Sequence, residues 1–228
     1  MKDLQTREPQ YQEHVELART KGLTRLGLRA NATWEIDPRR LMIVLARYKF
    51  VAKLLSGRQR VLEVGCGDAF GTRIVQQEVK SVCAIDFDPV FVADVNGRMD
   101  EKWKFECLVH DMLSGPVPGG FDAAFSLDVI EHIPAADEDR FVGNIVNSLA
   151  GLGVCIIGTP SLESQVHASA GSKAGHINCK DAQQLRTLMN KFFAEVFIFS
   201  MNDEVVHTGF YPMAHYLFAL AVGKRTPA

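Results

Sequence analysis

The stretch that most constrains the fold is residues 61–71, which read VLEVGCGDAFG. It opens with a short, mostly apolar run that contains β-branched residues, the pattern of a strand buried on both faces. Gly65 and Gly67 then predict a tight turn, because a Cβ there would block positive φ angles and the close approach of a ligand to the backbone. Residues 69–78 can form a helix. A strand, a glycine turn and a helix in this order predict a nucleotide-type cofactor at the carboxyl end of a first parallel strand.

The spacing of the glycines distinguishes this turn from a dinucleotide site. A dinucleotide fingerprint has the form G-x-G-x-x-G, whereas Gly71 arrives one residue later, as G-x-G-x-x-x-G. Glu63, two residues before the first glycine, is also unusual for a dinucleotide site. Both departures argue against an NAD-type oxidoreductase, which we keep as an alternative function.

A carboxylate follows the second apolar run. Residues 81–85 predict a second strand, and Asp86 lies at its carboxyl end, about 20 residues beyond the glycine turn. A carboxylate at this place can accept hydrogen bonds from both hydroxyls of a ribose, and such charge-assisted bonds are strong. Asp88 precedes Pro89, which is typical of a helix N-cap. We therefore assign ribose binding to Asp86 and helix capping to Asp88.

The next apolar runs complete a pattern that resembles a known family. The arrangement E-x-G-x-G at residues 63–67 is similar to the first motif of class I S-adenosyl-L-methionine (SAM) methyltransferases. Residues 104–109 are followed by an acidic and an apolar residue, and residues 121–134 have the form F-D-x-x-x-x-x-D-V-I-E-H-I-P. A fifth run at 151–160 ends in G-T-P. Matches in this order resemble bacterial small-molecule methyltransferases and the O-methyltransferases of ubiquinone biosynthesis.

The resemblance implies a fold, a cofactor and a set of contacts. The fold would be Rossmann-like α/β, a doubly wound, mostly parallel sheet of seven strands with an antiparallel last strand and an N-terminal helical cap. The cofactor would be SAM, with S-adenosyl-L-homocysteine (SAH) as product. In this family the acidic residue after the third strand contacts the adenine amino group, and the next residue flanks the ring. We expect the following residues to contact the cofactor: Glu63, Gly65, Cys66, Gly67, Phe70, Asp86, Phe87, His110, Asp111, Met112, Leu127 and Asp128.

The rest of the chain is assigned around this core. Residues 1–36 are expected to form the helical cap or lid, with a helix over 8–20 and Arg25, Arg29 and Trp34 near the cofactor or simply at the surface. Residues 37–228 form the methyltransferase domain. Its first helix is predicted to begin at Asp37 as N-cap, and apolar residues recur at helical spacing up to a stop at Gly57.

The segment beyond the fifth strand is where this family usually receives its acceptor. Residues 161–177 form a long polar connection, which in a compact domain is often a lid or a binding segment. Asn178 is a candidate N-cap for a helix over 180–192. The apolar runs 196–201 and 216–222 are assigned to the sixth and seventh strands. Phe210, Tyr211 and His215 can reach the acceptor pocket or pack.

In methyl transfer the main task of the protein is to orient the cofactor and the acceptor, which is worth about 7–11 kcal/mol. A general base adds roughly 10²–10⁴ in rate. His132 is the best candidate for a base because it follows the fourth strand and its unperturbed pKa lies near neutrality. The alternative is that His132 packs near the sulfonium or caps a helix. His176, just before the predicted 180–192 helix, is the second candidate for a base or an acceptor contact.

A divalent metal is the open question at this site. Asp128, Glu131 and His132 correspond to an acidic-x-x-Glu-His cluster that is linked to divalent metal in the quinone O-methyltransferases. Aspartate replaces glutamate at the first position, and enzymes without metal also carry the D-x-x-E-H pattern. We predict no bound metal and keep a divalent cation at these residues as the alternative.

Charge and cysteine content narrow the function further. The formal net charge is −2, so no basic field draws the protein to nucleic acid. Five scattered cysteines without C-x-x-C, and no signal-peptide or membrane-spanning run, indicate the cytoplasm. We predict methyl transfer to a small molecule, at an oxygen of a phenol, quinol, sugar or polyketide-type acceptor. Small-molecule N-methylation and SAM binding without turnover are the alternatives, and a homodimer is compatible with the sequence.

Overall fold

The computed structural model describes residues 5–225 of the 228-residue chain. Its centre is a sheet with the strand order β3-β2-β1-β4-β5-β8-β6-β7. Strands β1 to β5 are parallel to one another, β8 pairs antiparallel with β5, and β6 pairs antiparallel with both β8 and β7. The strands are β1 Val61–Val64, β2 Val82–Asp86, β3 Glu106–Val109, β4 Phe121–Leu127, β5 Leu149–Pro160, β6 Phe193–Asn202, β7 Val205–His207 and β8 Tyr216–Lys224.

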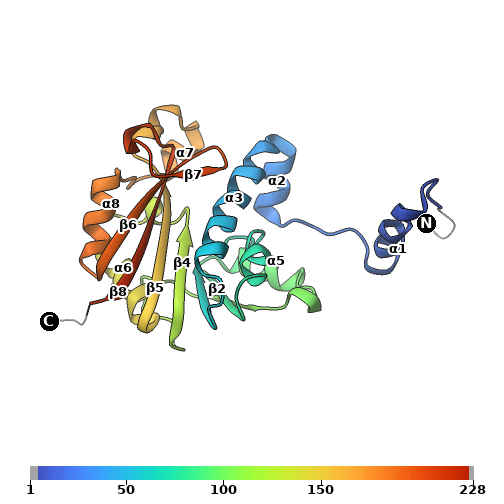
Figure 1. The fold of residues 1–228 in the computed structure, drawn as a ribbon, viewed down its shortest axis with the longest axis horizontal. Coiled ribbons are helices and arrows are strands. Elements are labelled where there is room, and N and C mark those ends of the chain that lie inside the picture. Colours follow the sequence, from blue (N-terminus) through green and yellow to red (C-terminus); the bar gives the residue numbers. More distant parts are fainter. Residues whose placement is uncertain (1–4, 226–228) are drawn as a thin grey trace.

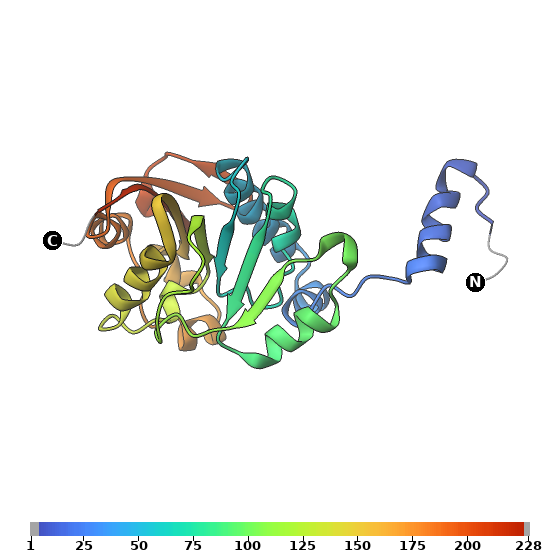
Figure 2. The ribbon, with the colours of Figure 1, turned by 90° about the horizontal axis from the view of Figure 1, so that it is seen from below.

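Helices cover both faces of the sheet, so each face has its own apolar core (Figures 1 and 2). On one face Phe141 and Ile145 of α6 and Leu185 of α8 pack on the sheet. On the other face Val51 of α3 and Val75 of α4 do so. The helices are α1 Gln12–Lys21, α2 Leu28–Ile36, α3 Arg39–Leu54, α4 Thr72–Gln76, α5 Pro89–Gly97, α6 Glu138–Ser148, α7 Ala170–Gly175 and α8 Ala182–Asn190, and the short 3-10 turns are η1 Pro9–Tyr11, η2 Glu101–Trp103, η3 Ile130–His132, η4 Glu163–His167 and η5 Tyr211–Met213.

The predicted Rossmann-like fold is confirmed, but the strand count of seven is wrong. An eighth strand, β7, pairs with the end of β6 at the edge of the sheet, with Asn202 opposite Val205. Asp203 in the connecting turn has a φ of 50°, the left-handed conformation that such a tight turn requires. Three residues are too few to show an alternating pattern, so the sequence alone did not reveal this strand.

Local capping was predicted correctly at one helix and wrongly at two. Asp88 accepts a hydrogen bond from the Val90 backbone and caps α5, as expected. For α8 the cap is Asp181 in a reciprocal capping box, whereas Asn178 uses its amide to bond the Ile133 carbonyl. Asp37 does not cap α3 with its side chain, because its carboxylate is bonded to Arg39.

The two N-terminal helices differ in how they contact the rest of the molecule. Helix α2 lies beside α3 at the carboxyl edge of the parallel strands, whereas α1 stands apart at the end of an extended segment over residues 22–27 (Figure 1). No residue of α1 is buried. Within residues 5–225, no helix combines the length and apolar character needed to cross a membrane.

Candidate functional site

The glycine turn after β1 has the backbone geometry that its sequence predicts. Gly65 has a φ of 75° and Gly67 a φ of 53°, both in the left-handed region. A Cβ on Gly65 would lie 2.3 Å from a methyl carbon of Val129, so this glycine lets the segment after β4 approach the turn. A Cβ on Gly67 would meet no atom within 4 Å. The turn therefore has open space on the side where a ligand would lie.

Glu63 lies beneath the turn and ties it to two helices. Its carboxylate accepts hydrogen bonds from the Tyr48 hydroxyl at 2.9 Å and from the Thr72 hydroxyl at 2.6 Å. The side chain is fully buried, and this burial raises the pKa of Glu63 to about 7. Both carboxylate oxygens are thus engaged within the protein.

Asp86 provides a test of whether a ribose would fit this edge of the sheet. Its carboxylate accepts one hydrogen bond from the Gly67 backbone at 2.8 Å and one from the Asp88 backbone at 2.9 Å. Its exposed fraction is 7%, and no cation among residues 5–225 pairs with it. Each carboxylate oxygen has a second lone pair, so this nearly buried acid can still accept bonds from hydroxyls. The donor chemistry of a ribose fits it.

The other residues predicted at this edge lie at the ends of β2 and β3. Phe87 is exposed, and Asp111 accepts a hydrogen bond from the Leu113 backbone. His110 bonds the Gly115 carbonyl through Nε2 at 2.9 Å. Met112 is buried in the core that α6 covers. The cofactor contacts assigned to these four residues stay predictions.

Two adjoining cavities lie at the carboxyl edge of the sheet. The first, here the turn cavity, is bounded by the glycine turn, α2 and α3, and six predicted cofactor residues line it. Its lining is Arg29, Ala30, Thr33, Leu41, Val44, Tyr48, Gly65, Cys66, Gly67, Asp68, Phe70, Gly71, Leu127 and Asp128. Helix α2 is held over it by the Ala30 backbone, which donates to the Asp68 carboxylate at 2.7 Å.

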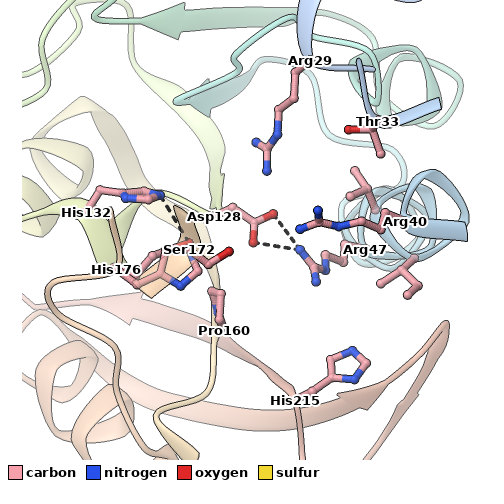
Figure 3. Close-up of a pocket in the computed structure, with 13 residues that line it drawn as sticks. Arg29, Thr33, Arg40, Arg47, Asp128, His132, Pro160, Ser172, His176 and His215 are labelled. Atoms are coloured by element: carbon pink, nitrogen blue, oxygen red, sulfur yellow. Dashed lines mark hydrogen bonds and ion pairs between the residues drawn. The ribbon is translucent and has the colours of Figure 1, made fainter. Parts of the chain in front are cut away.

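The second, here the outer cavity, has a volume of about 270 Å³ and is shown in Figure 3. It shares Arg29, Thr33, Val44 and Asp128 with the turn cavity. Its lining is Arg29, Thr33, Arg40, Ile43, Val44, Arg47, Asp128, Glu131, His132, Pro160, Ser172, His176 and His215. Both predicted bases and His215 are in this set, whereas Phe210 and Tyr211 are not.

An ion pair joins α3 to the end of β4 where the cavities meet. Arg47 Nη1 lies 2.8 Å from each carboxylate oxygen of Asp128. Asp128 has a φ of 57°, a strained conformation for a residue with a side chain, of the kind that gathers at functional sites. The guanidinium also lies 3.7 Å above the Tyr216 ring. Although burial opposes the charge, Asp128 raises the pKa of Arg47.

The two candidate bases face each other, with ring centroids 5.2 Å apart. His132 Nδ1 lies 2.8 Å from the Gly175 carbonyl. Because a carbonyl only accepts, Nδ1 carries the proton, and Nε2 of the neutral ring has the free lone pair. His176 Nδ1 bonds the Gln165 side chain at 3.0 Å. Burial, and then the neighbouring His132, lower the pKa of His176.

Glu131 completes a group of donors on the same side of the cavity. One of its oxygens accepts from the Thr159 hydroxyl at 3.2 Å, and the other is buried with no hydrogen-bond partner. Burial, and then Asp128, raise the pKa of Glu131 to about 8. Glu131, His132 and His176 offer ligand atoms within 4.8 Å of one another and could hold a metal ion. Asp128, which the metal alternative above groups with Glu131 and His132, pairs instead with Arg47.

The glycine turn, Asp86 and the parallel strands coincide with a known domain. Residues 61–153 match the sequence family described as "Methyltransferase domain". A probable S-adenosylmethionine-dependent methyltransferase of Mycobacterium tuberculosis is 30% identical over 119 residues. Residues 61–153 carry a methyltransferase domain that is similar to those of SAM-dependent methyltransferases. The matched region is 50% of this chain and 42% of the relative, so the chain spans less than half the length of the curated relatives it matches. SAM is the cofactor of this family.

Solved structures share the fold of the methyltransferase domain. N-methyltransferase NodS of Bradyrhizobium japonicum, in complex with SAH, superposes with a TM-score of 0.61 at 16% identity, covering 87% of this chain and 94% of NodS. A SAM-dependent methyltransferase of Clostridium acetobutylicum gives a TM-score of 0.66 at 10% identity, covering 85% of this chain and 96% of its own. At these identities the likeness concerns the fold alone.

Sequence reasoning missed the arginines of the methyltransferase domain that point into the outer cavity. Arg47 was passed over because its helix was assigned to packing. A signal was present: Arg47 is three residues after Val44 and four before Val51, so it lies on the apolar stripe of α3. A charged residue in such a stripe needs a partner, and Asp128 is 81 residues away in the sequence. No local sequence pattern could have identified Asp128 as the partner of Arg47.

Proposed function

We propose that this protein transfers the methyl group of SAM to a hydroxyl oxygen of a small molecule held in the outer cavity. The observation that carries the proposal is that the outer cavity adjoins the turn cavity. They share Asp128 and Val44, and the far side of the outer cavity presents His132 and His176. A cofactor in one cavity and an acceptor in the other would therefore be neighbours, close to two proton acceptors.

The chain's own residues have three tasks in this reaction. Bound SAM supplies a methyl group on a sulfonium, already activated for displacement. Asp86 and the glycine turn hold the cofactor, and the walls of the outer cavity orient the acceptor, which is the larger part of the rate gain. His132 Nε2, the nitrogen left free by the Gly175 bond, takes the hydroxyl proton. His176 is the second proton acceptor or an acceptor contact.

The test is turnover with methyl-labelled SAM. The purified protein is incubated with ¹³C-methyl SAM and metabolite fractions, and SAH and the labelled product are measured together. We expect both to appear, with a ¹³C chemical shift typical of an O-methyl group. A shift typical of an N-methyl group would replace oxygen by nitrogen as the methylated atom. Tight SAH binding without any product would favour a non-catalytic SAM-binding protein.

The predicted bases are tested with single substitutions. His132→Ala should lower kcat by about 10²-fold or more, with SAH affinity unchanged, because the imidazole acts on the acceptor and not on the cofactor. His167→Ala is the matched control, since His167 lies outside both cavities. A His132→Ala protein with the wild-type rate would remove this residue from the mechanism and leave His176 as the candidate.

A further inference from the structure

We propose that the methyl acceptor carries an anionic group, a phosphate or a carboxylate, which binds to Arg40 and Arg47 on the α3 wall of the outer cavity. This inference rests on the proposed function, because it takes the outer cavity as the acceptor site. It adds the charge of the substrate to the proposed function.

The charge of the cavity lining is the first observation. Three arginines line the outer cavity, against two acids, Asp128 and Glu131. Arg29 also lines the turn cavity, so it can serve the cofactor, whereas Arg40 and Arg47 line the outer cavity alone. Figure 3 shows the three guanidinium groups directed toward Asp128 from two sides. A neutral acceptor would leave this excess of positive charge uncompensated.

The second observation is that these arginines have unused donors. The guanidinium of Arg40 has no hydrogen bond or ion pair with any other residue in the range 5–225, whereas its backbone N–H donates to the Asp37 carbonyl. Arg47 meets Asp128 through Nη1 alone, and its Nε is buried without a partner. An arginine has five N–H donors in a planar fork that matches the oxygens of phosphates and carboxylates. An unpaired buried donor is costly, and an anionic ligand would complete its hydrogen bonds.

The segment just before β8 presents another unpaired donor. His215, just before β8, accepts at Nδ1 a hydrogen bond from the Asp203 backbone at 3.4 Å. The proton is therefore on Nε2, which is buried and has no partner. Burial, and then Arg47, lower the pKa of His215. A nearby positive charge lowers the pKa of a histidine because it disfavours the charged imidazolium.

The geometry of α3 places the two arginines on one wall. Arg40 and Arg47 are seven residues apart, which is two helical turns, so they project from the same face of the helix. Arg39, next to Arg40, points elsewhere: it pairs with Asp37 and does not line the cavity. Arg39 and Arg40 thus have the same charge, but only Arg40 lines the outer cavity.

The experiment uses the full chain saturated with SAH, so that Arg29 and the cofactor site are already occupied. Inorganic phosphate and acetate are titrated by calorimetry at constant ionic strength into the wild type, Arg40→Gln and Arg39→Gln. We expect millimolar binding to the wild type, about tenfold weaker binding to Arg40→Gln, and no change in Arg39→Gln. Tighter binding of phosphate indicates a phosphate ester as acceptor, and tighter binding of acetate indicates a carboxylate.

A double variant examines Arg47 without leaving a buried charge unpaired. Arg47→Gln with Asp128→Asn replaces the ion pair by two amides of similar size, and we expect weaker anion binding in this protein as well. The inference is overturned if neither anion binds the wild type, if Arg39→Gln loses as much as Arg40→Gln, or if both cavity variants bind as the wild type does.

The failure of this inference can be told apart from the failure of the proposed function. Turnover of a neutral acceptor that Arg40→Gln leaves unchanged would overturn the anionic group and keep the methyltransferase activity. Arginine-dependent phosphate binding, with SAH binding but no turnover of any fraction, would keep the anion site and remove the catalytic proposal.

Discussion

Glu63 is an acid whose protonation is linked to folding. Its pKa is about 7 in the folded protein, above the ordinary value of 4.5, because the side chain is buried. Between these two values the folded chain binds more protons than the unfolded chain, so this contribution to stability is fully present below pH 4.5 and is lost as the pH rises through 7. The difference corresponds to about 3 kcal/mol.

Replacing Glu63 by glutamine should remove this pH dependence. The amide can still accept from the Tyr48 hydroxyl and can donate to the Thr72 hydroxyl. We expect the free energy of unfolding of the wild type, measured with urea, to fall between pH 5 and pH 8 by up to about 3 kcal/mol more than that of Glu63→Gln. Parallel pH profiles for the two proteins would show that Glu63 does not titrate in this range.

Asp86 and Asp88 are neighbouring carboxylates for which we expect different roles. Asp86→Ala should weaken SAM binding by about 1–3 kcal/mol, the scale of losing hydrogen bonds to a charged group. Asp88→Ala should instead cost about 1 kcal/mol of stability, because it removes the cap of α5, with SAM affinity unchanged. Calorimetry with SAM and urea unfolding measure both. Unchanged SAM affinity in Asp86→Ala would remove this residue from the site.

The residues that the sequence could identify are those with a local signature. The glycine turn and Asp86 follow apolar strands at regular spacing, so their positions could be predicted without a structure. Arg40 has no such signature, and the only signal at Arg47 is a charge within the apolar stripe of α3, which does not identify its partner. Their role depends on the packing of α3 over the carboxyl edge of the sheet, which brings Arg47 to Asp128 across 81 residues.

At the scale of elements, Gly71 shows how closely α3 and α4 pack. A Cβ at this position would lie 2.2 Å from the Tyr48 ring. The ring cannot move away freely, because it is held edge-on against Phe125 and its hydroxyl is bonded to Glu63. Gly71→Ala should therefore destabilise the protein by about 1–3 kcal/mol, as measured by urea unfolding.

Gly97, the last residue of α5, is the matched control for this substitution. A Cβ there would meet no atom within 4 Å, and alanine is the better helix former. Gly97→Ala should leave the protein as stable or stabilise it by about 0.5–1 kcal/mol. If Gly71→Ala and Gly97→Ala changed the free energy of unfolding equally, the close approach of Gly71 to Tyr48 would not be the cause of a destabilisation.

Elements were predictable where a pattern runs over many residues. The five parallel strands and the helix α3 follow from apolar spacing alone. The strand β7 could not be predicted in this way, because it has only three residues. The cap of α8 could not be predicted either, because both Asn178 and Asp181 are residue types that cap helices. Asp181 is the cap because Gln184 lies three residues later and completes the capping box.

At the scale of the whole molecule, α1 contributes little to the fold. None of its residues is buried, and its contact with the domain includes an exposed ion pair of 3.6 Å between Lys21 and Asp100, a kind of contact that is worth little. Deleting residues 1–21 should change the free energy of unfolding by no more than about 0.5 kcal/mol and leave SAH affinity as it is. A truncated protein that binds SAH weakly would show that α1 serves the cofactor site.

Two successive residues of α3 serve the two cavities. Tyr48 reaches under the glycine turn to Glu63, while Arg47 reaches across to Asp128. A rigid helix transmits any tilt or slide to both side chains at once. Under the proposed function, cofactor affinity and acceptor affinity cannot then be tuned separately by moving this helix, and a measurement of one becomes a readout of the other. Selection for a new acceptor would have to alter side chains at the rim and leave the helix in place.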